Sequence, residues 1–268
     1  GHFGSADAIA EAKAEILEDA TADTLVVANA DDERVMRHVR QFRGRRLTYG
    51  TEATADVQAT RVDDHGFDGT TSEVTTPWGP LVLRLAVPGR ANLMNVLAAA
   101  TVALEAGVSV ADVARVASTL QPVDRRGSSA TLANGVRLID DSYNASPAAV
   151  RVTVQALAAT STLGRRIAVL GEMRELGDDA VRWHEDCGRA VADAHLDLLV
   201  AVGGPAADGL IAGAKAGGMS ADQLQRFATS QEAAPAVAAL VRAGDVVLVK
   251  GSRGTRTDII ADRLKEVA

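Results

Sequence analysis

Short apolar runs alternate with helical segments through the second half of the chain, and this alternation constrains the fold more than any other feature. Each apolar run suits a buried strand, and each intervening segment suits a helix that returns the chain to the same sheet. We expect strands over residues 136–139, 167–170, 196–202, around 225–228 and 246–249, and helices over 180–194, 206–216, 231–242 and 257–266. The pattern predicts a Rossmann-like, doubly wound parallel sheet.

The first of these strands ends abruptly in a polar turn. Five polar residues follow the apolar run, namely Asp140, Asp141, Ser142, Tyr143 and Asn144. Ser146 can cap the next helix, and Pro147 suits its first turn. Ligands of open α/β sheets bind at the carboxyl ends of strands, so this turn is a candidate binding site. A turn that merely closes the strand would have the same composition.

Two other strand ends carry polar loops, at residues 171–178 (GEMRELGD) and 250–254 (KGSRG). Neither is a dinucleotide fingerprint, because the spacing G-x-G-x-x-G is absent from both. Lys250 precedes its glycine, so the second loop is not a P-loop, and the printed sequence contains no G-x-x-x-x-G-K-[ST] motif. The loops can still hold a carboxylate or phosphate by charge-assisted hydrogen bonds, although capping and surface charge explain them as well.

The first half opens with an Ala-rich helix that Ser5 can cap and that carries Lys13 among several glutamates. A solvated lysine paired with those glutamates is the simplest interpretation. A strand over residues 24–29 then ends at Asn29, Asp31 and Asp32, where a helix N-cap explains Asp31 as well as a nucleotide does. Residues 46–88 alternate in the manner of antiparallel strands and suggest no chemistry.

Asn92 and Asn95 stand three residues apart at the start of a helix that Gly107 ends. They therefore share one face, and amides can both donate to and accept from an adenine edge. Capping is the alternative role for both asparagines.

Charge and cysteine content narrow the class of protein. The net charge of −7 argues against a nucleic-acid partner. Cys187 is the single cysteine, so no internal disulfide forms and a reducing compartment suits the chain. The sequence has no uncharged apolar run of membrane-spanning length and no signal peptide at its start. We expect a soluble, cytoplasmic monomer.

Several of these stretches together resemble the Mur ligase family. They are FGSADAIAEAKAEI at the start, NADD at 29–32, PGRANLMNVLAAA at 88–100, DDSYNAS at 140–146, GEMRELGD at 171–178 and VLVKGSRG at 247–254. The resemblance implies the C-terminal part of a central ATP-binding domain over residues 1–123 and a Rossmann-like ligase domain over 124–268. It also implies that the family's N-terminal domain and P-loop region lie outside this sequence. His2 is too close to the FGS motif to match the family's metal-binding histidine.

The resemblance assigns roles to individual residues. Lys13 matches a lysine that is carbamylated in the family and helps to hold Mg²⁺ beside the ATP γ-phosphate. Arg126, in the linker 120–127, matches an arginine that reaches the ATP phosphates, and Asp141 matches an aspartate near the ATP ribose and phosphates. Asn92 and Asn95 match the adenine side, although this chain has Ala91 where the family usually has histidine, and Asn29 matches a position near the nucleotide. Candidates for substrate binding are Asn144, Glu172, Arg174, Lys250, Ser252 and Arg253.

The implied activity is ATP-dependent amide-bond formation in peptidoglycan precursor synthesis. The resemblance is strongest to members that join D-alanyl-D-alanine to UDP-N-acetylmuramoyl-tripeptide through an acyl phosphate. The alternatives are a sibling ligase that adds another amino acid and a non-catalytic binding module. Because the sequence contains no P-loop motif, we expect this polypeptide alone to bind ATP weakly and to form no amide bond.

Overall fold

The computed structural model describes residues 5–267, so His2 lies outside the described residues. The described chain forms two compact units. Unit 1 extends to Asp64 and resumes over Gly69–Leu120, whereas unit 2 takes His65–Asp68 and continues from Gln121. Among residues 5–267, no helix is both long and apolar enough to cross a membrane.

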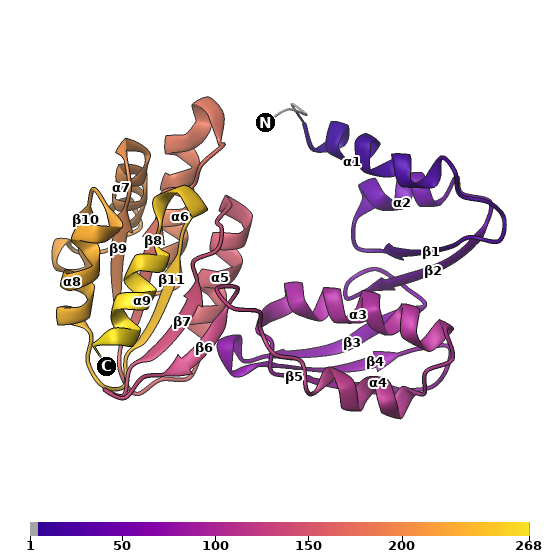
Figure 1. Cartoon of the computed structure of the whole chain (residues 1–268). Helices are drawn as coiled ribbons and strands as arrows, with labels where there is room; N and C mark the ends of the chain where they lie inside the picture. Colours follow the sequence, from indigo (N-terminus) through magenta and orange to yellow (C-terminus); the bar gives the residue numbers. More distant parts are fainter. Residues whose placement is uncertain (1–4, 268) are drawn as a thin grey trace. The chain divides into compact units, whose positions relative to one another are not determined.

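Unit 2 contains the predicted doubly wound sheet, which confirms the fold class (Figure 1). Its six strands lie in the order β10-β9-β8-β11-β7-β6, and all neighbours are parallel except β6 and β7. The strands are β6 (Ser128–Thr131), β7 (Arg137–Asp141), β8 (Arg166–Gly171), β9 (Leu198–Val202), β10 (Leu224–Phe227) and β11 (Val246–Lys250). The helices are α5 (Pro147–Ala159), α6 (Ala180–Asp193), α7 (Asp208–Ala216), α8 (Ser230–Leu240) and α9 (Asp258–Glu266).

Both faces of this sheet are buried by helices. One apolar cluster packs α5, α6 and α7 against one face, and a second packs α8 and α9 against the other. Strands β9 and β11 are buried at every position, which explains their uninterrupted apolar sequences. Strand β11 inserts between β7 and β8, so the loops that follow these three strands meet at one edge of the sheet.

Unit 1 contains a mixed five-stranded sheet in the order β1-β2-β3-β4-β5. Its strands are β1 (Leu25–Asn29), β2 (Arg45–Gly50), β3 (Val57–Asp64), β4 (Thr70–Thr75) and β5 (Leu81–Leu85). Its helices are α1 (Ala6–Ala14), α2 (Glu33–Val39), α3 (Gly89–Glu105) and α4 (Val110–Ala117). Helices α3 and α4 share an apolar core with β3, β4 and β5.

The expectation of antiparallel strands throughout residues 46–88 is correct for β3, β4 and β5 and wrong for β2. Strand β2 runs parallel to both β1 and β3. The crossover through α2 imposes the first parallel pairing. The second needs only a short loop, because β3 begins beside the end of β2, with Tyr49 opposite Val57.

Candidate functional site

The carboxyl edge of the unit 2 sheet collects the polar residues that follow β7, β8 and β11. Asp141 lies opposite Lys250 in the parallel register, and Lys250 lies opposite Leu170 on the other side. The apolar runs that precede these residues build the strands, and the change to polar residues ends each strand at the same level. Three polar loops therefore converge although they are far apart in sequence.

Asp141 and Lys250 form an ion pair at this edge. The Lys250 Nζ lies 2.6 Å from Asp141 Oδ2 and donates a second hydrogen bond of 3.0 Å to the Asn144 carbonyl. The Lys250 side chain is only 5% exposed, so the Asp141 carboxylate offsets the cost of burying its ammonium group. Burial raises the pKa of the Asp141 carboxyl, and the Lys250 ammonium offsets part of the rise. The ion pair has little net charge and fixes the start of the turn that follows β7.

Asp140 faces the opposite side of the sheet, as neighbouring strand residues do. Its carboxylate accepts hydrogen bonds from the Ser142 hydroxyl at 2.6 Å and from the Lys265 Nζ at 2.8 Å. Asp140 is 2% exposed and Lys265 belongs to α9, so this contact anchors the last helix to the turn. Asp141, not Asp140, is therefore the carboxylate on the side of Lys250.

Ser252 joins the three loops. Its Oγ accepts the Arg174 backbone N–H at 3.0 Å and lies 3.5 Å from the Ala145 carbonyl, to which it can donate. The hydroxyl belongs to a residue that is only 4% exposed, so its observed contacts are internal. Glu172 likewise accepts the Gly204 N–H at 3.0 Å. Both residues hold loops in place in this structure.

Three predicted residues remain at the surface of the same edge. The Arg126 guanidinium carbon lies 4.1 Å from the centre of the Tyr143 ring, an arrangement suited to a cation–π contact. Asn144 is exposed, and its side-chain oxygen accepts the next backbone N–H. Arg253 is exposed, and its side chain has no hydrogen bond or ion pair to any residue in the described part of the chain.

In unit 1, the end of β1 and the start of α3 are linked through one loop. Asp31 accepts the backbone N–H groups of residues 51, 52 and 53, and Arg90 donates to the Thr51 hydroxyl and to Glu52. Burial raises the pKa of the Asp31 carboxyl, but these hydrogen bonds outweigh burial and hold the pKa below its usual value. Asp32, not Asp31, caps α2, so the capping interpretation of Asp31 is wrong.

The three asparagines of unit 1 lie on these two elements. Asn29 ends β1 and accepts the Asp31 N–H at 2.9 Å. Asn92 donates to the Pro88 carbonyl at 2.7 Å, which leaves its side-chain oxygen as an acceptor. Asn95 is exposed one turn later in α3. Free amide groups at this helix start can recognise a base edge, as the sequence predicts.

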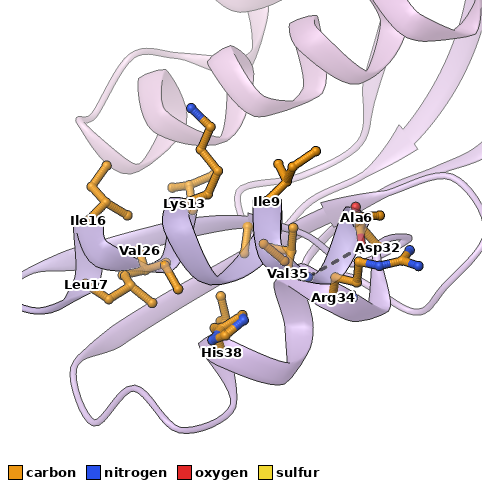
Figure 2. Close-up of a pocket in the computed structure, with 15 residues that line it drawn as sticks. Ala6, Ile9, Lys13, Ile16, Leu17, Val26, Asp32, Arg34, Val35 and His38 are labelled. Atoms are coloured by element: carbon orange, nitrogen blue, oxygen red, sulfur yellow. Dashed lines mark hydrogen bonds between the residues drawn. The ribbon is translucent and has the colours of Figure 1, made fainter. Parts of the chain in front are cut away.

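Lys13 lies on α1, which buries none of its residues. It lines a pocket of about 420 Å³ between α1, β1 and α2. Figure 2 shows that its side chain extends away from His38 and Asp32, which line the same pocket. Within residues 5–267 no group of three or more His, Cys, Asp or Glu is placed to hold a metal ion. The Lys13 ammonium has no lone pair to offer a metal, and the described residues around it do not complete a metal site.

The sequence interpretation missed three residues that shape the unit 2 edge: Lys265, Tyr143 as the partner of Arg126, and Arg125. The Arg125 backbone adopts a left-handed conformation, with φ of 58°, and its side chain pairs with Asp258 and Asp262 of α9. The sequence carries no signal for the Arg125 pairing, because a contact between residues 125 and 258 depends on the fold.

Comparison with known proteins identifies the class. Residues 1–103 match the Mur ligase middle domain, and residues 125–253 match the Mur ligase, glutamate ligase domain. The two matches follow the family's order and cover most of the chain. The chain therefore belongs to the Mur ligase family.

Individual relatives narrow the comparison further. The UDP-N-acetylmuramoyl-tripeptide–D-alanyl-D-alanine ligase of Mycobacterium tuberculosis is 36% identical over 281 residues, which cover 98% of this chain and 55% of that protein. A crystal structure of MurF from Acinetobacter baumannii matches with a TM-score of 0.85 and 29% identity, covering 99% of this chain and 57% of that one. MurF ligase from Thermotoga maritima in complex with ADP gives a TM-score of 0.80 at 25% identity, with 99% and 58% covered. The chain spans about half the length of the curated relatives it matches.

Proposed function

We propose that this chain forms part of a cytoplasmic ATP-dependent ligase that joins D-alanyl-D-alanine to UDP-N-acetylmuramoyl-tripeptide. The observation that carries the proposal is the 36% identity over 98% of the chain to a ligase named for this reaction. The converging loops after β7, β8 and β11 support it, because they supply a carboxylate, two arginines and several backbone donors at a carboxyl edge. In this proposal unit 1 contacts the adenine of ATP and unit 2 contacts the dipeptide.

The reaction would proceed in two steps, through an acyl phosphate. The terminal carboxylate of the tripeptide attacks the γ-phosphorus of ATP, and ADP leaves. The amine of the dipeptide then attacks the acyl carbon, phosphate leaves with the former carboxylate oxygen, and the amine loses a proton. Both steps develop negative charge on phosphoryl oxygens, so exposed guanidinium groups such as those of Arg126 and Arg174 are suited to stabilise it.

The resemblance to the family supplies the residue roles that we propose. We assign Asn92 and Asn95 to the adenine side, Asn29 to the vicinity of the nucleotide, Arg126 to the phosphates and Asp141 to the ribose and phosphates. Bound magnesium would neutralise phosphate charge, and Lys13 is the residue of this chain that would contribute a ligand after carbamylation. Lys250, Ser252 and Glu172 hold the loops, whereas Asn144, Arg174 and Arg253 remain accessible to a substrate.

A product assay tests the proposal. The complete protein that contains this chain would be incubated with magnesium-ATP, UDP-N-acetylmuramoyl-tripeptide and D-alanyl-D-alanine. We expect one phosphate released for each UDP-N-acetylmuramoyl-pentapeptide detected by mass spectrometry. Product formed with a single amino acid instead of the dipeptide would identify a sibling ligase, and nucleotide binding without any product would identify a binding module. The 268-residue polypeptide run in parallel tests our expectation that it forms no amide bond by itself.

A further inference from the structure

Residues 123–126 of unit 2 form a tight turn just before β6, and the third residue of this turn has an unusual backbone. The Arg126 N–H donates to the Val123 carbonyl at 3.0 Å, which closes the turn. Arg125 has a φ of 58°, a left-handed conformation that residues other than glycine rarely adopt. Turns with a positive φ at the third position normally have glycine or asparagine there, so the arginine is accompanied by backbone strain.

The Arg125 side chain is held by two carboxylates of α9. One guanidinium nitrogen lies 2.9 Å from Asp258 Oδ2, and another lies 3.0 Å from Asp262 Oδ2. The two aspartates stand four residues apart in the helix, so they share one face. Burial tends to raise the pKa of Asp258, but its ion pairs with Arg256 and Arg125 hold that pKa below its usual value. The charge of Arg125 is therefore already offset within the chain and is not free for a ligand.

The backbone of the same turn is tied to the end of β7. The Arg125 carbonyl accepts the Tyr143 N–H at 3.1 Å, and the Gly127 N–H donates to the Asp140 carbonyl at 3.0 Å. Arg126 stands between these two contacts. It is exposed, and its guanidinium carbon lies 4.1 Å from the centre of the Tyr143 ring. The direction of the Arg126 side chain thus depends on a segment that is anchored on both sides.

We propose that Arg125 is a positioning residue, which anchors the turn to α9 and so fixes the direction in which Arg126 is presented. That Arg126 meets the ATP phosphates rests on the proposed function. A free arginine side chain loses much rotamer entropy when it is ordered, and an orientation fixed in advance reduces that loss. The benefit is largest where geometry matters most, in the transition state of phosphoryl transfer. Loss of Arg125 should therefore lower kcat more than it changes the KM of the dipeptide.

The first test needs no catalysis and uses NMR of the isotope-labelled 268-residue chain. The ring current of Tyr143 should move the side-chain proton resonances of Arg126 upfield, and Tyr143→Leu should abolish that displacement. We expect Arg125→Gly to abolish most of it as well. Arg125→Lys, which keeps a cation near both carboxylates, should retain part of it.

A matched control for this test is His195→Gly. His195 also has a left-handed backbone, with φ of 51°, but it is exposed and lies just after α6. Its replacement changes the backbone in the same way without removing an ion pair to α9. The Arg126 resonances and the ligase kinetics should both stay unchanged.

The second test measures the ligase kinetics of the complete protein. Arg125→Gly should lower kcat at least about tenfold. The KM of the dipeptide should change by less than about twofold, because the lost interaction belongs to the transition state. In an Arg126→Gln background the same replacement should have little further effect, since Arg125 acts through Arg126.

Thermal stability distinguishes positioning from a general structural role. In Arg125→Gly, the loss of a partly exposed ion pair and the relief of backbone strain oppose each other, so the thermal midpoint should stay within about 3 °C. Arg125→Ala loses the ion pair but keeps the strain, so it should unfold at a lower temperature and yet have the kcat of Arg125→Gly. A kcat that followed the thermal midpoint would show that Arg125 acts only through stability.

The remaining outcomes separate this proposal from the proposed function. Unchanged Arg126 resonances in Arg125→Gly, with pentapeptide product at an unchanged kcat, would overturn the positioning role and leave the function intact. An equal loss of kcat with and without Arg126 would show that Arg125 acts on the reaction directly. Arg126 resonances that depend on Arg125, in a protein that forms no pentapeptide, would leave the positioning role intact and overturn the function.

Discussion

The two units bury their sheets to different extents. In unit 2, helices cover both faces, and β8, β9 and β11 are buried along nearly their whole length. In unit 1, β1 is buried at one position, α1 at none, and Ile16 is 83% exposed. The apolar side chains of α1, β1 and α2 line an open pocket instead of a closed core (Figure 2). Unit 1 therefore has a closed core only around β3, β4 and β5, and its accessible apolar surface lies around α1, β1 and α2.

The same contrast holds for the candidate functional residues. At the edge of unit 2, Asp140 and Asp141 each meet a lysine, so the turn is held in one geometry before any ligand arrives. In unit 1, Lys13 is exposed and has no ion-pair partner in the described chain. The turn after β7 in unit 2 therefore has its geometry before a ligand binds. The role proposed for Lys13 in unit 1 instead depends on a carbamate and a bound metal.

The largest effect should come from a cavity in the closed core of unit 2. Leu248 is fully buried in the cluster that α5, α6 and α7 cover. Leu248→Ala should lower the free energy of unfolding of unit 2 by about 2–5 kcal/mol, because it removes apolar contacts and leaves a cavity. Ile16→Ala should change stability by no more than about 0.5 kcal/mol, since that side chain is already in solvent. Equal losses would contradict the contrast between the units.

Urea denaturation followed by tryptophan fluorescence can separate the units. Trp183 lies in α6 of unit 2, and Trp78 lies in unit 1. In a Trp78→Phe background the emission reports on unit 2 alone, and in a Trp183→Phe background it reports on unit 1. The Leu248→Ala effect should appear in the Trp183 transition.

The next effect concerns the ion pair at the edge of unit 2. Lys250→Met keeps the length of the side chain but leaves the Asp141 carboxylate buried without its partner. We expect a loss of about 3 kcal/mol at neutral pH. Burial already raises the pKa of Asp141, so the loss should shrink as the pH falls through that pKa and the carboxyl becomes neutral. The double variant Lys250→Met/Asp141→Asn should recover most of the stability; no recovery would mean that Lys250 acts mainly by packing.

A functional change without a change in stability is expected in unit 1. In the complete protein, Lys13→Ala should lower turnover at least a hundredfold, about 2.7 kcal/mol in activation free energy, because the proposed carbamate is lost. A short-chain carboxylic acid should partly restore activity by replacing the missing carboxylate. The thermal midpoint should stay unchanged, since α1 buries no residue. Lys215→Ala, at an exposed position of α7, serves as the control, and full activity of Lys13→Ala would end the carbamate hypothesis.

The sequence predicted the fold of unit 2 well, because burial on both faces leaves a strong pattern. The expected strand at 246–249 is observed as Val246–Lys250, and the expected helix at 180–194 as Ala180–Asp193. The pattern in unit 1 is weaker, and the antiparallel pairing expected for residues 46–88 does not extend to β2. Its pairing depends on the stagger between Tyr49 and Val57, which periodicity does not encode.

The candidate site was predictable in its location and less so in its contacts. Strand ends pointed to Asp141 and Lys250, but not to the fact that they pair with each other. That contact needs the register of two strands separated by more than a hundred residues. Lys265 and Arg125 could not be found from sequence, because their partners depend on where α9 packs.

The smallest effect expected is a pH dependence confined to unit 2, and it arises from His184. This buried side chain accepts the Met173 N–H at its Nε2, at 2.8 Å, and its Nδ1 lies 2.6 Å from the Ala180 carbonyl. The neutral ring satisfies both contacts, since one nitrogen accepts and the other donates. Burial lowers the pKa of His184 below its usual value of 6.5. The Ala180 carbonyl and the charge of Glu172 offset part of this lowering. Because Met173 follows β8, the histidine supports the loop that carries Glu172 and Arg174.

Protonation should therefore weaken unit 2 more than unit 1. A pKa that is lower in the folded state than in the unfolded state gives a stabilisation that is complete above about pH 6.5 and is lost as the pH falls toward the folded-state value. We expect His184 to contribute a loss of at most about 1.4 kcal/mol for each pH unit in that window.

Urea midpoints of the Trp78→Phe protein between pH 7.5 and 5.5 measure the effect. His184→Gln should flatten the profile, because an amide can make both contacts without titrating. His195→Gln, at an exposed position of the same unit, should leave the profile unchanged. If both variants keep the full slope, another group carries the pH dependence.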